Sequence, residues 1–287
     1  IFYFYYYFLW LLLYFMGYII MEKQNQLYYK ACLCSYCGDN YNGWQRQKNA
    51  IGIQNILENT LSSLYNHEIL IAGSGRTDTN VHALGQVFHF SSSKYFDNKT
   101  LLKGLNGLLP DDIVIYDIID VNNLFHAGKS IISKTYEYKI LNTPVRDPFL
   151  LNRALWVRKE INIENLKNIL KEFEGTHDFH SFCVKKTKKE NTVRTINYIS
   201  IEKNNNNISI LINANGFLHN MVRIIIGTSL KMEKDNIHYS HIANIFNSKD
   251  RRCAGPTAHA YALYQKEAIY NNENIAGLMG IPEKYRV

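Results

Sequence analysis

The sequence is poor in cysteine, and the few cysteines that it has follow no regular spacing. There are five, at positions 32, 34, 37, 183 and 253. An odd number without a repeated framework argues against a secreted scaffold that is held together by disulfides. We therefore expect reduced thiols and a fold that is stabilised by a hydrophobic core.

Three of the thiols, Cys32, Cys34 and Cys37, lie close enough in sequence to raise the alternative of a zinc site. However, Cys32 and Cys34 fall within a strand-like run at 27–36, and no nearby Cys or His pair completes a set of four ligands. A structural role for the thiols is favoured, and a zinc-binding protein is a distant alternative. Neither a metal nor another cofactor is predicted.

Residues 1–20 lack charge altogether, and their length would suffice to span a bilayer. They also lack a basic segment at their start and a small-residue cleavage site, which argues against a signal peptide. Met21 follows directly, and we expect translation to begin there and residues 1–20 to lie outside the fold. A membrane anchor is the alternative, and mass spectrometry of the native N-terminus distinguishes the two.

The remaining composition is that of a globular protein with a basic surface. Apolar residues make up 46% of the chain, an ordinary share, and the 287 residues suffice for one large domain or two smaller ones. The formal net charge of +7 suits a polyanionic partner.

Strand-like and helix-like segments alternate from residue 26 onward and predict a mixed α/β fold in two units, 21–129 and 130–287. In the first unit, apolar residues recur at helical spacing within 52–65. The other elements expected there are strands at 27–36 and 113–120, a strand ending near 91, and a helix at 99–108.

In the second unit, Asn162 is expected to begin a helix and Gly175 to follow its end. Alternating apolar residues predict a half-buried strand at 134–141. The other expected elements are a hairpin of strands at 194–203 and 207–214, a helix at 217–232 and a helix from about 240.

The segment Gly73-Ser-Gly-Arg-Thr-Asp-Thr-Asn-Val-His-Ala-Leu-Gly-Gln-Val-Phe-His-Phe90 is the most informative part of the chain. Its glycines, Gly73 and Gly75, permit conformations with positive φ. Arg76 and Asp78 are two positions apart, so an extended backbone would point both side chains to one side. A carboxylate and a guanidinium in such a loop suit chemistry on an anionic substrate, although an isolated Arg-Thr-Asp is more often a surface turn.

Other segments accompany this loop. They are Tyr41-Asn-Gly-Trp-Gln-Arg-Gln47, Lys134-Thr-Tyr-Glu-Tyr138, Gly175-Thr-His-Asp-Phe-His-Ser-Phe182, Gly216-Phe-Leu-His-Asn-Met-Val-Arg-Ile-Ile-Ile-Gly-Thr228 and Ala254-Gly-Pro-Thr-Ala-His-Ala-Tyr-Ala-Leu263. Within the fourth, Leu218 and Met221 are expected in the core of a helix that Arg223 interrupts, and a buried guanidinium needs an anion. With the loop, the set resembles the TruA family of tRNA pseudouridine synthases. Asn80 stands where that family usually has Gly, and Asn tolerates the left-handed region.

The resemblance implies that Asp78 is the catalytic nucleophile, that Arg223 pairs with it and that Tyr136 packs on the uracil. It further implies that Arg76 fills the space left by the target base. The candidate substrate-binding residues are Arg76, Tyr136, Gln45, Arg46, Lys185 and Lys186. Ordinary turn packing explains Gln45 and Arg46 equally well, and the two lysines belong to a basic run suited to RNA phosphates.

The fold that the resemblance implies has two ferredoxin-like halves, whose antiparallel sheets form one continuous platform with an RNA-binding cleft. The implied activity is the isomerisation of uridine to pseudouridine in the anticodon stem-loop of tRNA, by a homodimer and without a cofactor. We expect a cytoplasmic protein, with an organelle as the alternative. The other functions left open are a tRNA-binding protein without catalysis and a related synthase with another RNA target.

Overall fold

The computed structural model describes residues 26–184 and 191–271. These residues form one mostly antiparallel sheet of ten strands together with five α-helices and short 3-10 turns, which confirms the mixed α/β class. Each of these five helices is too short or too polar to cross a membrane. The predictions for residues 1–20, Lys185 and Lys186 lie outside the described residues.

The first half of the sheet carries two helices packed against its strands. Its elements are β1 (Tyr28–Tyr36), α2 (Ile53–Tyr65), β2 (Ala72–Gly73), β3 (His82–Ser92), α3 (Asn98–Leu108) and β4 (Ile113–Val121). The predicted stripe of α2 is confirmed, because Ile53, Leu57 and Leu61 are fully buried in one cluster with Cys32 and Cys34 of β1. These two thiols are therefore core residues.

The second half follows from residue 131. Its elements are β5 (Ile131–Asn142), β6 (Leu155–Val157), α4 (Ile163–Lys171), β7 (Gly175–Asp178), β8 (Val193–Asn204), β9 (Asn207–Ala214), α5 (Met221–Lys234), α6 (His241–Ser248) and β10 (Leu263–Tyr270). The predicted N-cap of α4 is confirmed, since the side chain of Asn162 accepts a hydrogen bond of 3.0 Å from the backbone N–H of Asn165.

Two helix boundaries differ from the prediction. The helix α4 ends at Lys171, and Gly175 instead begins β7 with a φ of +95°. The helix α5 begins at Met221 rather than near 217, because Asn220 takes a left-handed φ of 62°, which a right-handed helix cannot contain. Leu218 consequently lies in a loop that lines a cavity, and the expectation that it belongs to a helical core was wrong.

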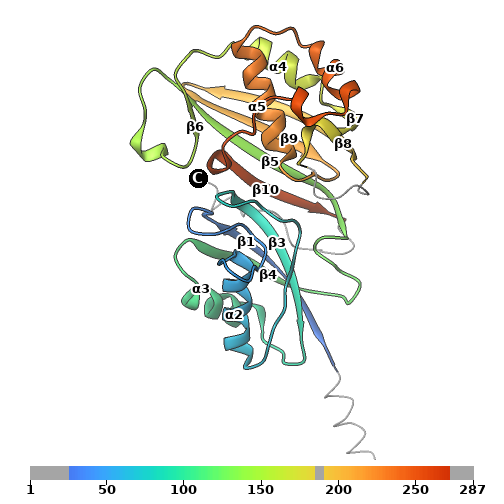
Figure 1. Ribbon diagram of the computed structural model, residues 1–287. Coiled ribbons are helices and arrows are strands. Elements are labelled where there is room, and N and C mark those ends of the chain that lie inside the picture. The colour runs from blue at the N-terminus through green and yellow to red at the C-terminus, as the bar shows by residue number, and fades with distance from the viewer. Residues whose placement is uncertain (1–25, 185–190, 272–287) are drawn as a thin grey trace, which may run out of the picture.

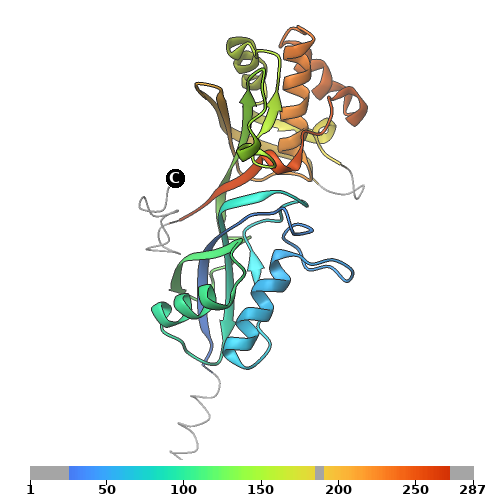
Figure 2. The same ribbon diagram turned by 90° about the vertical axis from the view of Figure 1, so that its left-hand side faces the viewer.

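The two halves are joined edge to edge in the order β4-β1-β3-β10-β5-β9-β8-β7, with β2 paired to β3 and β6 paired to β5. The junction is the parallel pairing of β3 with β10, in which His82 lies opposite Tyr264 and Ala83 opposite Gln265. Figures 1 and 2 show one half above the other with β10 crossing between them. This junction brings loops from both halves to one place.

Candidate active site

The segment between β2 and β3 carries Asp78 and is tied to the turn that follows β1. The backbone N–H of Trp44 donates to the carbonyl of Thr77 at 3.1 Å, and the hydroxyls of Thr77 and Tyr36 are 2.8 Å apart. Asn80 has a φ of 63°, so the expectation that Asn would serve the turn in place of Gly is confirmed. The loop is thereby held against the end of β1 and the turn that follows it.

The glycines of this loop serve close packing rather than positive φ. In the described part of the chain, the glycines with positive φ are Gly43 and Gly175, so that expectation was wrong for Gly73 and Gly75. A Cβ on Gly73 would lie 2.7 Å from the indole of Trp44, which occupies the space beside it. Gly43 has a φ of +81°, and a Cβ there would lie 2.4 Å from the carbonyl oxygen of Thr77.

A buried polar network beneath the loop links it to both halves of the sheet. Gln86 of β3 donates from Nε2 to the carbonyl of Gly75 at 2.8 Å and accepts a hydrogen bond from the hydroxyl of Ser74. Gln265 of β10 donates to the Ser74 hydroxyl at 2.9 Å and to Gln86 Oε1 at 3.0 Å. Both glutamines are fully buried, so the loop position depends on the β3–β10 junction.

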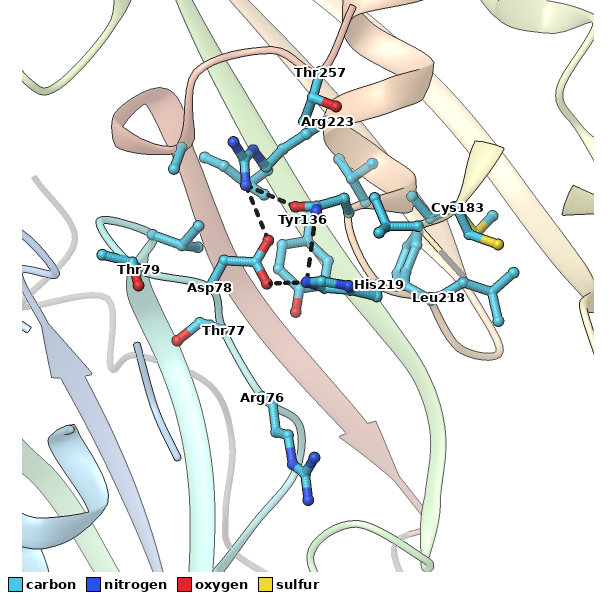
Figure 3. Close-up of a pocket in the computed structure, with 18 of the residues that line it drawn as sticks. Arg76, Thr77, Asp78, Thr79, Tyr136, Cys183, Leu218, His219, Arg223 and Thr257 are labelled. Carbon is cyan, nitrogen blue, oxygen red and sulfur yellow. Dashed lines mark hydrogen bonds and ion pairs between the residues drawn. The ribbon is translucent and has the colours of Figure 1, made fainter. Parts of the chain in front are cut away.

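Asp78 meets a guanidinium from the other half. Arg223 of α5 donates from Nη1 to Asp78 Oδ2 at 3.1 Å and to Asn220 Oδ1 at 2.7 Å, and from Nε to the carbonyl of Ala258 at 2.8 Å. The expected pair is therefore present, and Figure 3 shows the carboxylate turned toward the guanidinium. The segment 254–263 contributes the carbonyl that fixes the opposite edge of the guanidinium.

His219 is a further neighbour of Asp78, and sequence reasoning did not single it out. Its Nε2 lies 3.5 Å from Asp78 Oδ1, and Figure 3 shows the carboxylate between His219 and Arg223. His219 and Asn220 both belong to the segment 216–228, but they were expected within a helix. The left-handed turn at Asn220 is what directs them toward the site.

Tyr136 lies beside the carboxylate in a cavity of about 1140 Å³. It is 7% exposed, and its ring packs edge-to-face on Phe217 with 5.0 Å between the ring centres. Burial raises the pKa of the Tyr136 phenol well above its ordinary value, and the nearby charge of Asp78 adds to the rise. The phenol is therefore neutral at physiological pH. The site has an apolar side at Tyr136 and Phe217 and a charged side at Asp78.

The other candidate substrate-binding residues differ in whether they line this cavity. Arg76 and Gln45 line the same cavity, and Arg76 is exposed and points away from Asp78. Arg46 is not among the lining residues, because its guanidinium forms an ion pair with buried Glu58 of α2. This arrangement favours turn packing for Arg46, and a contact between Arg46 and RNA stays a prediction.

The thiols considered for zinc do not gather at one point. Among residues 26–184 and 191–271, the group close enough for metal ligation is Cys37, Asp39 and His82. The backbone N–H of Gly38 donates to His82 Nδ1 at 3.0 Å, so the ring proton sits on Nε2 and is directed at the carbonyls of two other segments. Both ring nitrogens are thus engaged in hydrogen bonds. His82 therefore holds together the segments that contain Gly38, Asn152 and Tyr261.

The chain is similar to known proteins over most of its length. A profile described as tRNA pseudouridine synthase matches residues 33–128 and 169–271. The chain is 41% identical to tRNA pseudouridine synthase A of Thermoanaerobacter sp. (strain X514), over 82% of this chain and 96% of that protein. It is 38% identical to the protein of the same name from Ehrlichia chaffeensis, over 82% and 97% respectively.

The matching profile covers parts of both halves and includes Asp78, His219 and Arg223, whereas Tyr136 lies in its gap at 129–168. The chain therefore belongs to the TruA family of tRNA pseudouridine synthases, which are isomerases. Among solved structures, a Cbf5-Nop10-Gar1 complex aligns with a TM-score of 0.33 and 10% identity, over 70% of this chain and 53% of that one, and it carries no argument here.

Proposed function

We propose that the protein isomerises uridine to pseudouridine in the anticodon stem-loop of tRNA, with Asp78 as the nucleophile. The observation that carries the proposal is the carboxylate of Asp78, held by Arg223 at 3.1 Å in a cavity that also contains Tyr136. A carboxylate held in place beside an aromatic surface suits a reaction at the anomeric carbon of a nucleoside.

The reaction breaks the bond between N1 and C1′, turns the uracil, and joins C5 to C1′. The target base must first leave the stack, which costs a few kcal/mol, and Arg76 would fill the space that it vacates. Asp78 then attacks C1′ as N1 leaves, or it takes a proton from the ribose to give a glycal. In the first route, attack by C5 on C1′ later releases the carboxylate.

Tyr136 and Arg223 would support the chemistry without becoming covalently attached. The Tyr136 ring would pack on the uracil as it turns, a contact worth about 1–3 kcal/mol per base. The proton lost from C5 would pass to a water molecule, or to the phenol oxygen as the phenol gives its own proton to water. The guanidinium of Arg223 would hold the Asp78 carboxylate in place through its hydrogen bond. Gln45 lines the same cavity and would contact the nucleotide beside the target.

The proposed RNA-binding cleft lies between two ferredoxin-like halves, 21–129 and 130–287. The order of strands supports this division: β4-β1-β3-β2 in the first half and β10-β5-β9-β8 in the second follow the same plan. Lys185 and Lys186 would contact phosphates of the RNA. The active form would be a homodimer. Light scattering would contradict this if the free protein had the mass of one chain and the complex had the mass of one chain with one tRNA.

The deciding experiment measures the release of tritium from C5 of uracil. The isomerisation joins C5 to C1′, and the hydrogen isotope on C5 is then lost to water. The purified chain should release tritium from a labelled tRNA transcript, whereas Asp78→Asn should release it more than about a thousandfold more slowly. Asp111→Asn changes an exposed carboxylate that does not line the cavity, and it serves as the matched control. A transcript whose anticodon stem-loop uridines are replaced by cytidines should release nothing.

Two results would overturn the proposal. If neither the parent chain nor Asp78→Asn releases tritium although the transcript is bound, RNA binding without catalysis is favoured. If the uridine-free anticodon transcript still releases tritium, the enzyme is a related synthase with another target.

A further inference from the structure

Lys134 carries an amine that the chemistry above does not use. It lies on β5 two residues before Tyr136, and both side chains line the same cavity. Residues two apart on a strand share a face and are separated by about 6.6 Å, a distance within the span of one nucleotide. The amine therefore borders the space in which the target base would stack.

The catalytic loop is shaped to admit this amine. A Cβ added to Gly75 would lie 2.7 Å from Lys134 Nζ, closer than a carbon and an ammonium can approach. The φ of Gly75 is not positive, so its backbone conformation is open to other residues. Glycine is needed at position 75 because Lys134 Nζ occupies the place of a side chain.

The amine has no anionic partner in the described part of the protein, which contains neither an ion pair nor a hydrogen bond from Lys134 Nζ. The carboxylate that lines the same cavity, Asp78, is already between Arg223 and His219. Burial lowers the pKa of the Lys134 ammonium, and the positive charge of Arg194 lowers it further. A half-buried cation in this setting is stabilised by an anion from outside.

We propose that Lys134 binds a backbone phosphate of the RNA beside the target uridine, and that Gly75 keeps the space that this contact requires. The inference rests on the proposed function, since it needs RNA in this cavity. Arg76 is exposed on the same cavity, so the phosphate enters between two cations while the base reaches Tyr136. Lys134 is thus a substrate-binding residue of the site.

The proposal predicts by how much the salt dependence of RNA binding should change when Lys134 is replaced. Each phosphate that a protein neutralises releases counterions, and the slope of log K against log salt changes by about 0.7–0.9 per contact. Loss of the Lys134 contact should make the slope less negative by that amount. A residue that merely supported the fold would lower affinity without changing the slope.

The experiment compares Lys134→Met with Lys139→Met, a matched control on the same strand. The Lys139 amine lies 4.6 Å from the ring centre of Tyr264 and is not part of the cavity lining. Binding of an unmodified tRNA transcript is titrated between about 50 and 200 mM salt, in an Asp78→Asn background that prevents turnover. Lys134→Met should bind roughly tenfold to hundredfold more weakly, with the reduced slope, and Lys139→Met should match the background.

Gly75→Ala tests the same contact without removing a charge. Its Cβ can be accommodated only by moving the end of the flexible Lys134 side chain, so folding should be nearly unchanged while the RNA contact is lost. We expect weaker binding and a reduced slope, as for Lys134→Met, and an unchanged melting temperature. A parental slope in both variants would overturn the proposal.

The experiments distinguish a failure of the Lys134 inference from a failure of the proposed function. If the parent chain releases tritium and Lys134→Met keeps the affinity and slope of the background, only the inference about Lys134 fails. If the transcript binds and the slope changes but no tritium is released, the phosphate contact stands and the catalytic proposal fails. A parent chain that does not bind the transcript would overturn both.

Discussion

The planar guanidinium of Arg223 donates three hydrogen bonds, and its acceptors lie in different directions. Its acceptors are the Asp78 carboxylate, the Asn220 amide oxygen and the Ala258 carbonyl, at 2.7 to 3.1 Å. Such a fork fixes the position and the rotation of the guanidinium, which an ammonium could not match, and one of its bonds reaches Asp78 Oδ2. His219 approaches the same carboxylate at 3.5 Å but is 37% exposed, so water weakens its contribution.

This difference predicts unequal effects of two substitutions. Arg223→Lys keeps the charge but loses the fork, and we expect single-turnover tritium release to fall about tenfold to hundredfold. His219→Ala should cost roughly fivefold at most, as is typical of a partly exposed polar contact. Both variants are compared at saturating tRNA, so that the chemical step is measured. A parental rate for Arg223→Lys would mean that charge alone is sufficient.

The sequence pointed to the residues that carry charge but not to those that position them. Asp78 and Arg223 were expected together, and the structure brings them together across the two halves. Gln265 and Ser74 gave no signal, because a buried glutamine and serine look like surface residues until the β3–β10 junction encloses them. The ion pair of Arg46 with Glu58 also gave no signal, since Glu58 lies on a helix that sequence alone did not place beside Arg46.

At the scale of elements, short left-handed turns decide where the site residues point. Asn220 ends the loop before α5 with a φ of 62°, and Asn80 ends the catalytic loop before β3 with a φ of 63°. The apolar spacing of residues 218–225 predicted a helix that begins too early, because periodicity does not register a single residue with positive φ. The loop residues that were assigned to this helix are those that reach Asp78.

The turn at Asn80 gives a prediction for stability. Asn80→Gly restores the residue usual in the family and keeps the φ, so the free energy of unfolding should change by less than about 0.5 kcal/mol. Asn80→Ala places a Cβ in the left-handed region and should cost about 1–2 kcal/mol. Urea denaturation of both variants measures the difference. Equal stability of Asn80→Ala and the parent would show that the turn relaxes to another conformation.

At the scale of the whole molecule, the site exists only where the two halves meet. Asp78 comes from the first half, whereas Tyr136 and Arg223 come from β5 and α5 of the second. Contact between them depends on β3 pairing with β10, which lies about 180 positions later in the chain. Strand periodicity predicted most strands but carried no information on this pairing, because alternation fixes the face of a strand and not its neighbour.

Gly85 is a point at which the two strands of this junction approach closely. A Cβ there would lie 2.5 Å from the carbonyl oxygen of Lys266 in β10, and a backbone atom cannot move aside as a side chain can. Gly85→Ala should therefore destabilise the protein by about 1–3 kcal/mol.

A shift of β10 also displaces the Ser74–Gln86–Gln265 network, so Gly85→Ala should slow tritium release even well below its melting temperature. Gly107→Ala in α3 is the matched control, since a Cβ there meets nothing within 4 Å and should be neutral or stabilising by up to about 1 kcal/mol. Thermal unfolding and tritium release are measured on both variants. Full activity together with lost stability in Gly85→Ala would show that the junction supports the fold without setting the geometry of the site.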